Sequence, residues 1–216
     1  MVAVAIRQEY GPTLGQLLSP RWRGASRLTQ ALAIACALAL VALVGAAAVS
    51  LLNASYSHGG RVPFSFSYRS MQRVAPEGEE FVRVERDYGD GRLEDSFAVS
   101  PLLLPPYSGA LSGELALYAT GYIQALSRRA TRFALRGEGK TKVNGLPAYD
   151  VFYSAEVQGH TMYGRNVLLV PERPGARAGV TIVMLTAPKA NAQVTSSLLV
   201  ATVGVLSRPF TTFTLN

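Results

Sequence analysis

The stretch from Leu28 to Ser57 carries no charged side chain, and this feature constrains the fold of the chain more than any other. Its core, from Ala31 to Leu52, reads ALAIACALALVALVGAAAVSLL. A helix of about 20 apolar residues crosses the hydrocarbon core of a bilayer, whereas a buried helix of a globular domain normally shows a polar stripe, which this segment lacks. The sequence therefore predicts a transmembrane helix over residues 28–52.

Basic residues on the two sides of this segment indicate its orientation. Three arginines precede it (Arg21, Arg23, Arg27) and two follow it (Arg61, Arg69). Because cytoplasmic flanks carry the excess of Lys and Arg, we expect the N-terminus in the cytoplasm and the C-terminal part outside it. The protein would then be a single-pass protein of the cell membrane.

A cleaved signal peptide is the alternative to a permanent anchor. Ala46-Ala47-Ala48 offers small residues at a plausible cleavage site. The segment before the apolar run, however, is longer than the basic region of a signal peptide usually is. The only cysteine, Cys36, lies inside the run, which excludes a disulfide within the chain. Whatever follows the segment must therefore be held together by its own hydrophobic core.

The 216 residues divide into four predicted parts. We expect a short cytoplasmic tail (1–27), the transmembrane helix (28–52), a stalk (53–60) and an extracytoplasmic α+β domain (61–216). The last part has the length of one domain with a single core. Hydrophobic residues make up 49% of the chain and charged residues only 16%, which suits a chain with a membrane segment.

Alternation of apolar and polar residues predicts the elements of the outer domain. We expect strands at 62–69, 79–87, 92–100, 133–135, 149–157, 162–170 and 179–188, the last as a central strand, with a loop at PLLLPPYSG. One helix begins with Ser112 as its N-cap and ends at Arg128-Arg129, and a final helix runs from Asn191 to Ser207. Val151 and Tyr153 lie on a predicted buried face. This pattern predicts an α+β fold in which helices flank an antiparallel sheet.

The second half of this domain contains KVNGLPAYDVFYSAEVQG, a returning strand, VTIVMLTAP, and a final helix that ends in VLSRPF. This succession resembles the PsbP-like group, which includes accessory proteins of photosystem II and several bacterial cell-envelope proteins. The resemblance covers residues 61–216 in element order and is sharpest over 142–210. It implies an antiparallel sheet flanked by helices and a non-enzymatic accessory or assembly role, and it transfers no ligand-binding residue.

The string ALRGEGKT, at residues 134–141, fits a relaxed phosphate-loop pattern. A phosphate loop needs a strand, a glycine loop and then a helix whose N-terminus binds phosphate. Here Asn144-Gly145 and Pro147 follow within a few residues, so a turn is expected in place of a helix. We therefore predict a strand that leads into a surface turn, and no bound nucleotide.

Two stretches of opposite charge stand out in the outer domain. Residues 128–142 hold six basic side chains and one acid, Glu138, and residues 77–95 are rich in acids. The basic stretch lacks the aromatic side chains of a nucleic-acid platform, so no nucleic acid is expected. A solvated face or contact with anionic lipid or envelope polymer fits it better, and the two stretches could pair with each other or face different partners.

Candidate catalytic or metal-binding residues are few. His160 follows Gly159 at a predicted hairpin tip and is the only histidine of the outer domain, and the pairs Glu79-Glu80 and Glu94-Asp95 are expected to be solvated. One histidine without a cysteine falls short of the usual zinc ligands, and no G-x-S-x-G nucleophile motif occurs. We predict no catalytic, metal or cofactor site.

The sequence thus favours a membrane-anchored protein whose outer domain binds a partner or ligand without catalysis. Its candidate partners are the membrane itself, another envelope protein or an anionic envelope polymer. The alternative is an envelope hydrolase that uses an atypical carboxylate site or His160. A pocket of converging carboxylates or one around His160 would favour the enzyme, whereas an open groove lined by tyrosines and valines would favour binding.

Overall fold

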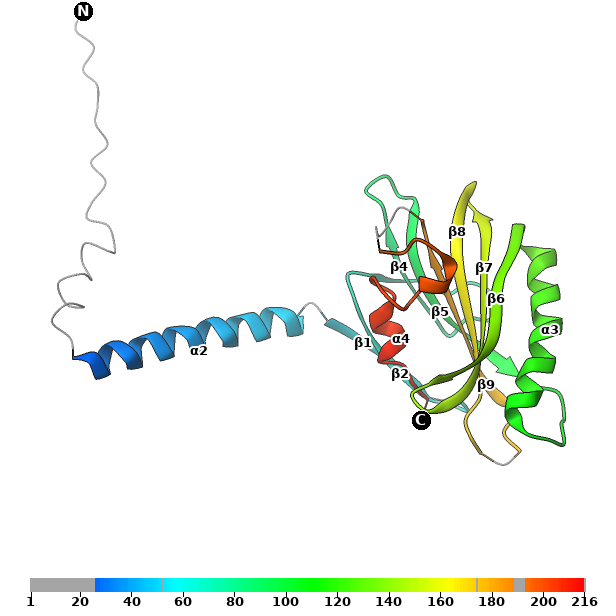
Figure 1. Cartoon of the computed structure of the whole chain (residues 1–216), viewed down its shortest axis with the longest axis horizontal. Coiled ribbons are helices and arrows are strands. Elements are labelled where there is room, and N and C mark those ends of the chain that lie inside the picture. Colours follow the sequence, from blue (N-terminus) through cyan, green and yellow to red (C-terminus); the bar gives the residue numbers. More distant parts are fainter. Residues whose placement is uncertain (1–25, 52, 174, 189–192, 216) are drawn as a thin grey trace, which may run out of the picture. The chain divides into compact units, whose positions relative to one another are not determined.

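The computed structural model describes residues 26–51, 53–173, 175–188 and 193–215 (Figure 1). The chain divides into two compact units between Leu51 and Leu52. The first contains the helix α2 (Arg27–Leu51), and the second contains the strands and the remaining helices.

Helix α2 contains most of the apolar run, which is therefore helical as predicted. Several of its described apolar side chains are exposed, among them Leu32, Leu38 and Leu43. Within the part of the chain that the structure describes, no helix combines the length and hydropathy needed to span a membrane. The transmembrane role of residues 28–52 therefore stays a prediction.

A seven-stranded antiparallel sheet forms the body of the second unit, in the order β3-β4-β5-β9-β8-β7-β6. Its strands are β3 (Gln72–Val74), β4 (Val82–Asp87), β5 (Leu93–Leu103), β6 (Thr131–Val143), β7 (Leu146–Val157), β8 (His160–Leu169) and β9 (Ala178–Thr186). β9 lies in the middle, and most of its residues on both faces are buried, as its continuous apolar run predicted. The predicted α+β class with an antiparallel sheet is confirmed.

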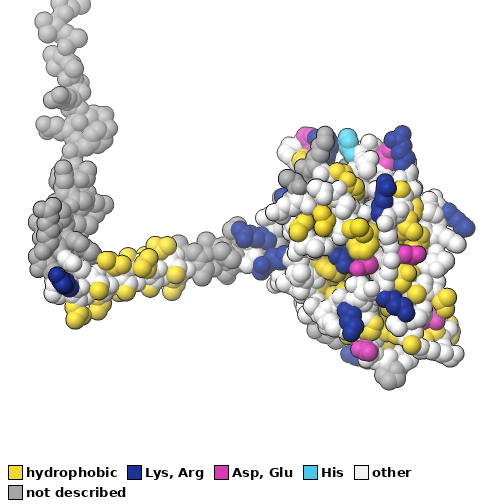
Figure 2. Space-filling model, in the orientation of Figure 1, with side chains coloured by type: hydrophobic (Ala, Val, Ile, Leu, Met, Phe, Trp, Pro, Cys, Tyr) yellow, Lys and Arg dark blue, Asp and Glu magenta, His cyan; other side chains and the backbone are white. Residues whose placement is uncertain are grey.

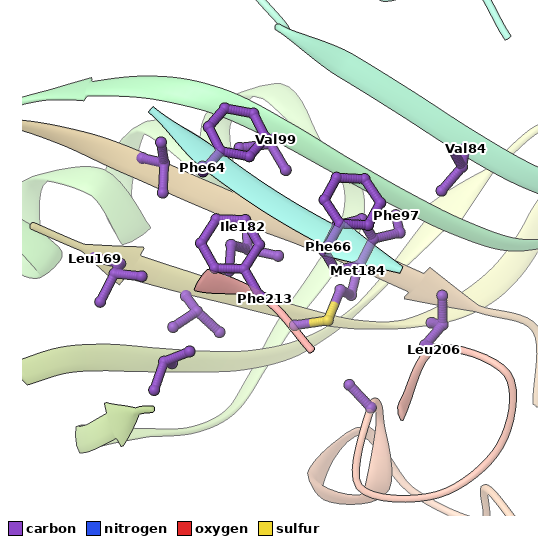
Figure 3. Packing of buried hydrophobic residues seen from close by; sticks show 14 of the residues in the cluster. Phe64, Phe66, Val84, Phe97, Val99, Leu169, Ile182, Met184, Leu206 and Phe213 are labelled. Carbon is purple, nitrogen blue, oxygen red and sulfur yellow. The ribbon is translucent and has the colours of Figure 1, made fainter. Parts of the chain in front are cut away.

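A second, three-stranded sheet packs its aromatic side chains on one face of the large sheet. It consists of β1 (Asn53–His58), β2 (Phe64–Arg69) and β10 (Thr214–Leu215) in the order β1-β2-β10. Phe64 and Phe66 of β2 gather with Phe213, Phe97 and Met184 in the main core (Figure 3). All five side chains are buried, and this aromatic cluster supplies a large share of the apolar surface removed from water.

The predicted stalk at 53–60 is wrong for most of its length, because residues 53–58 form β1. Every residue of β1 has a partner in β2, from Asn53 opposite Arg69 to His58 opposite Phe64. The Tyr56 ring contacts the rings of Phe64 and Phe66. β1 is rich in polar residues because much of it is exposed, and only its pairing with β2 makes it a strand. The folded domain therefore begins two residues after α2 ends.

The predicted final helix over 191–207 is also wrong. Residues 191 and 192 lie outside the described part, and residues 193–206 form turns and the short 3-10 helix η1 (Ser197–Leu199). Ala201 and Gly204 adopt positive φ angles of 62° and 81°, which end any regular helix. The helix α4 (Ser207–Thr211) then includes Pro209 in its first turn, where a proline N–H is not needed.

Helix α3 (Leu111–Arg129) covers part of the opposite face of the large sheet (Figure 1). Leu115 and Ala119 are fully buried against β5 and β8 residues, and Arg128 and Arg129 lie in the last turn as predicted. The predicted N-cap is wrong, since Ala110 occupies that position without a side-chain hydrogen bond and Ser112 lies inside the helix. β5 also continues to Leu103, so the predicted loop PLLLPPYSG begins later than expected.

Candidate functional site

The string ALRGEGKT lies entirely within β6, paired with β7 from Ala134 opposite Ser154 to Thr141 opposite Ala148. The turn Asn144-Gly145, with φ angles of 47° and 86°, then leads into β7 and not into a helix. The predicted strand and turn are confirmed, and the turn comes after the motif, which is strand throughout. A backbone committed to a strand ladder cannot curl its amides around a phosphate.

Replacing Lys140 by alanine is expected to change the free energy of unfolding by only about 0.5 kcal/mol, because the side chain is exposed and has no ion pair among the described residues. Thermal unfolding of the full-length wild type and of Lys140→Ala, each with and without ATP and magnesium, measures this. Stabilisation by ATP that disappears in the variant would contradict the assignment of a plain strand.

His160 is the first residue of β8 and is exposed at the tip of the β7–β8 hairpin, as predicted. It borders a half-open hollow of about 400 Å³ at one end of the large sheet. The hollow is lined by Tyr88, Arg92, Leu93, His160, Thr161, Met162, Ala187 and Pro188. None of these lining residues is a carboxylate, so His160 and the acidic pairs do not converge there.

Most carboxylates of the acidic stretch form ion pairs with nearby arginines. Arg83 lies within 2.9 Å of Glu77, Glu80 and Glu85. Arg86 lies 2.8 Å from Glu94 and 2.6 Å from Asp95. These contacts resolve the question left open by the sequence, because the acids pair with neighbouring arginines and not with the basic stretch at 128–142.

The prediction that Glu94 and Asp95 are solvated is wrong. Asp95 is buried, and besides Arg86 its carboxylate accepts a hydrogen bond of 2.6 Å from the Thr186 hydroxyl. Burial raises the pKa of Glu94, while the charge of Arg86 opposes this shift. The pair thus ties the β4–β5 hairpin to the end of β9, which is a structural role.

A second hollow, of about 500 Å³ and also half-open, runs along one side of α3. We call it the α3 hollow; it is lined by Leu117, Tyr118, Gly121, Tyr122, Ala125, Leu126 and Arg129. Gly121 leaves open space, since a Cβ placed there would meet no atom within 4 Å. Tyr118 and Tyr122 are four residues apart and therefore share one face of α3, and both are partly buried at the edge of this hollow.

A buried network of side-chain hydrogen bonds connects Tyr122 to the large sheet. The side-chain amide of Asn166 donates a hydrogen bond of 2.6 Å to the Tyr122 hydroxyl, and the Tyr153 hydroxyl donates one of 3.2 Å to the Asn166 carbonyl oxygen. Asn166 and Tyr153 are buried, which confirms the predicted buried position of Tyr153. Burial raises the pKa of Tyr122 to about 12. Side-chain hydrogen bonds therefore hold the base of the α3 hollow, and its tyrosine is neutral at physiological pH.

Sequence reasoning missed Asn166 altogether. The sequence did contain an indication of it, since Asn166 stands between Arg165 and the apolar run VLLV of a predicted strand. A buried amide in a strand needs hydrogen-bond partners from other elements. Those partners, Tyr122 and Tyr153, are far away in the sequence, and only the packing of α3 on the sheet brings them together.

The raised pKa of Tyr122 predicts a pH dependence of stability. Its folded pKa of about 12 exceeds the usual value of 10, so its stabilising effect is complete below pH 10 and is lost as the pH rises through 12. Denaturant unfolding should show Tyr122→Phe about 1–2 kcal/mol less stable than wild type at pH 8, because the Asn166 amide loses its acceptor. The difference should shrink above pH 10.

The matched control is Tyr118→Phe, because the hydroxyl of Tyr118 makes no hydrogen bond among the described residues. Its cost should stay within about 0.5 kcal/mol at pH 8. Equal costs for the two variants would contradict the network.

Comparison with family models gives no match, and comparison with curated proteins gives none. Among solved structures, the chain is similar to a cyanobacterial PsbP from Synechocystis, with 15% identity and a TM-score of 0.49, over 76% of this chain and 92% of that chain. It is also similar to LpqN, described as involved in cell envelope biogenesis of Mycobacterium tuberculosis, with 10% identity and a TM-score of 0.48, over 76% and 91% of the two chains. A PsbP is thus among the similar structures, in agreement with the resemblance found in the sequence.

Proposed function

We propose that this chain is a single-pass membrane protein whose outer domain, residues 53–215, binds a partner or ligand without catalysis. The uncharged stretch Leu28–Ser57 and its helical conformation over α2 support an anchor. The excess of arginines before the stretch supports a cytoplasmic N-terminus and an extracytoplasmic domain.

The observation that carries the binding role is the α3 hollow. It joins two tyrosine rings and the exposed Leu117 with open space over Gly121, and it has the cation Arg129 at one end. Binding sites combine an apolar lining with a few polar groups that orient the ligand, and rigid tyrosines lose little entropy on binding. The hollow therefore suits an apolar or aromatic group that carries a negative charge near Arg129.

A photo-crosslinking residue tests this role in intact cells. Placed at Gly121 in the full chain, benzoylphenylalanine should capture a defined partner, because that position faces the hollow. The same residue at Thr120, which is exposed but does not line the hollow, is the matched control. Equal capture at the two positions, or none at Gly121, would refute binding in the hollow.

The topology has its own test. Protease added to cells with a permeabilised outer wall should digest the domain and spare the tail before Arg27. Degradation of the tail with a protected domain would reverse the orientation. Mass spectrometry of the mature protein separates the anchor from a cleaved signal, since a chain that starts near Val49 would exclude the anchor.

A hydrolase centred on His160 is the second candidate, favoured by the hollow in which His160 lies beside Tyr88, Arg92 and Thr161. Hydrolysis of ester or phosphoester substrates by the full chain, abolished in His160→Ala and kept in His58→Ala, would support it. Activity that survives His160→Ala would exclude this site.

A further inference from the structure

A third hollow lies where the C-terminal segment crosses the large sheet, on the face opposite α3. It is half-open, has a volume of about 380 Å³ and is lined by Arg136, Tyr163, Ser196, Ser197 and Leu198. The short helix η1 contacts β6, β7 and β8, so this hollow lies between η1 and the sheet. We call it the η1 hollow. It shares no lining residue with the α3 hollow or with the hollow at His160.

A bulge in β6 brings Arg136 to this face. Arg136 has no partner in β7, because the pairing of the two strands shifts register there. Its Nε donates a hydrogen bond of 3.1 Å to the Ser154 hydroxyl. The neighbouring Tyr153 points to the other face, where it packs with residues of α3, and Lys140 lies on that face too, opposite Tyr149. Arg136 is therefore separated from the lysines of the same strand.

Several donors of the η1 hollow have no acceptor within the described part of the chain. The Arg136 side chain uses only its Nε, so both terminal amino groups of the guanidinium are open. Ser196 precedes η1, but its hydroxyl makes no capping hydrogen bond. The Ser197 hydroxyl has no described partner either, although this residue is only 2% exposed. Because a buried hydroxyl normally has a partner, one that borders a hollow indicates an acceptor supplied by a ligand.

The charge of the η1 hollow is positive. Among the described residues that line it, none is a carboxylate. Glu156, two residues after Ser154 in β7, is already bound to Arg132 at 2.8 Å. Figure 2 views the domain from the side on which the C-terminal segment crosses the sheet, and its Lys and Arg side chains stand apart from one another, with apolar side chains between them. A single cation beside hydroxyls suits a compact anion, whereas a long polyanion needs a continuous basic surface.

Apolar surface borders these donors. Leu198 is 53% exposed, and a Cβ placed at Gly137 would lie 3.5 Å from its side chain, so Leu198 lies over β6 next to Arg136. Tyr163 of β8 is half-buried and adds an aromatic ring to the lining. Ligand sites typically combine such an apolar lining with a few convergent polar groups. The η1 hollow can therefore hold an anionic group and an attached apolar group together.

We propose that the η1 hollow binds a phosphate monoester whose organic part is small and apolar. The two terminal amino groups of a guanidinium donate parallel hydrogen bonds to phosphate oxygens. A phosphate monoester has a third terminal oxygen that can accept from Ser196 and Ser197, whereas a carboxylate has only two oxygens. The organic part then lies on Leu198 and Tyr163. This site is independent of the α3 hollow, which lies on the other face of the sheet.

Calorimetric titration of the full chain, purified in a non-ionic detergent, with phenyl phosphate tests this proposal. Arg136→Gln should bind about tenfold or more weakly, because it removes the charged donor. Ser197→Ala should bind about threefold or more weakly, since one hydrogen bond to the phosphate is lost. Lys140→Gln is the matched control: it removes the same charge from the other face of the same strand and should bind like wild type. Thermal unfolding close to that of wild type shows that each variant is folded.

Four results would overturn the proposal: no binding of phenyl phosphate by the wild type, equal losses in Arg136→Gln and Lys140→Gln, equal affinity for benzoate, or equal affinity for inorganic phosphate. The first two remove the η1 hollow as the site, the third replaces phosphate by a carboxylate, and the fourth removes the contact with Leu198 and Tyr163. None of them bears on crosslinking at Gly121, so this proposal and the proposed function fail separately.

Discussion

Replacing Gly179 by alanine is expected to destabilise the domain by about 3 kcal/mol or more. Gly179 lies near the start of the central strand β9, opposite Leu102 of β5. A Cβ at this position would lie 2.1 Å from the backbone oxygen of Leu169 and 2.8 Å from the Val170 side chain. Because the nearest atom belongs to the backbone of a buried strand, the clash can be relieved only by moving β8 and β9 apart.

Gly139→Ala is the matched control, since Gly139 also lies in a strand of the same sheet but a Cβ there would meet no atom within 4 Å. Alanine should be neutral or stabilise this site by about 0.5 kcal/mol, through the lower entropy of the unfolded chain. Denaturant unfolding of both full-length variants measures the two effects. A loss at Gly179 as small as that at Gly139 would contradict the close approach of β9 to Leu169.

Arg165→Met is the second substitution with a large expected effect, a loss of about 3–5 kcal/mol. Arg165 and Asp150 are both buried and form two parallel hydrogen bonds of 2.9 Å. Arg165 also donates to the Val200 carbonyl, and its guanidinium lies 4.3 Å from the centre of the Phe210 ring. Its removal leaves the Asp150 charge buried without a partner and detaches the C-terminal segment from the sheet.

A double substitution separates these contributions. Asp150→Leu in the Arg165→Met background removes the stranded charge, so the double variant should be more stable than Arg165→Met alone. Limited proteolysis of the C-terminal segment should remain faster than in wild type in both, because both lack the contacts to Val200 and Phe210. If the unfolding free energies lost in Arg165→Met and in Asp150→Leu simply added up in the double variant, the ion pair would be contradicted.

Local sequence patterns were sufficient for much of the domain. Alternation in FSFSYR predicts β2, and Tyr149 to Val157 predicts β7, because side chains of a strand point to opposite faces in turn and one face is buried. The turns at Asn144-Gly145 and after Gln158 follow from residues that tolerate positive φ angles. The continuous apolar run of β9 predicts its central position, since both of its faces are covered.

Local patterns misled where the conformation depends on distant partners. The segment NASYSH was predicted to be a stalk because its residues are mostly polar and show no pattern of a buried face. It forms a strand only because it pairs with β2. The apolar C-terminal segment looked like a helix, but its buried residues fill the space beside the large sheet and are held there by Arg165. No local pattern encodes a contact with a strand many residues away.

The candidate surfaces divide in the same way. The amino-acid sequence by itself determined the apolar run of α2, the number of cations at 128–142 and the exclusion of a phosphate loop, because each depends on residues next to one another in the chain. Only the tertiary structure decided how these cations are divided between the two faces of the sheet and that Asn166 supports Tyr122 beneath the α3 hollow. Both arrangements depend on which strands pair and where α3 packs. Strand pairing and helix packing are in turn determined by the burial of apolar side chains from the whole core, and not by any one segment.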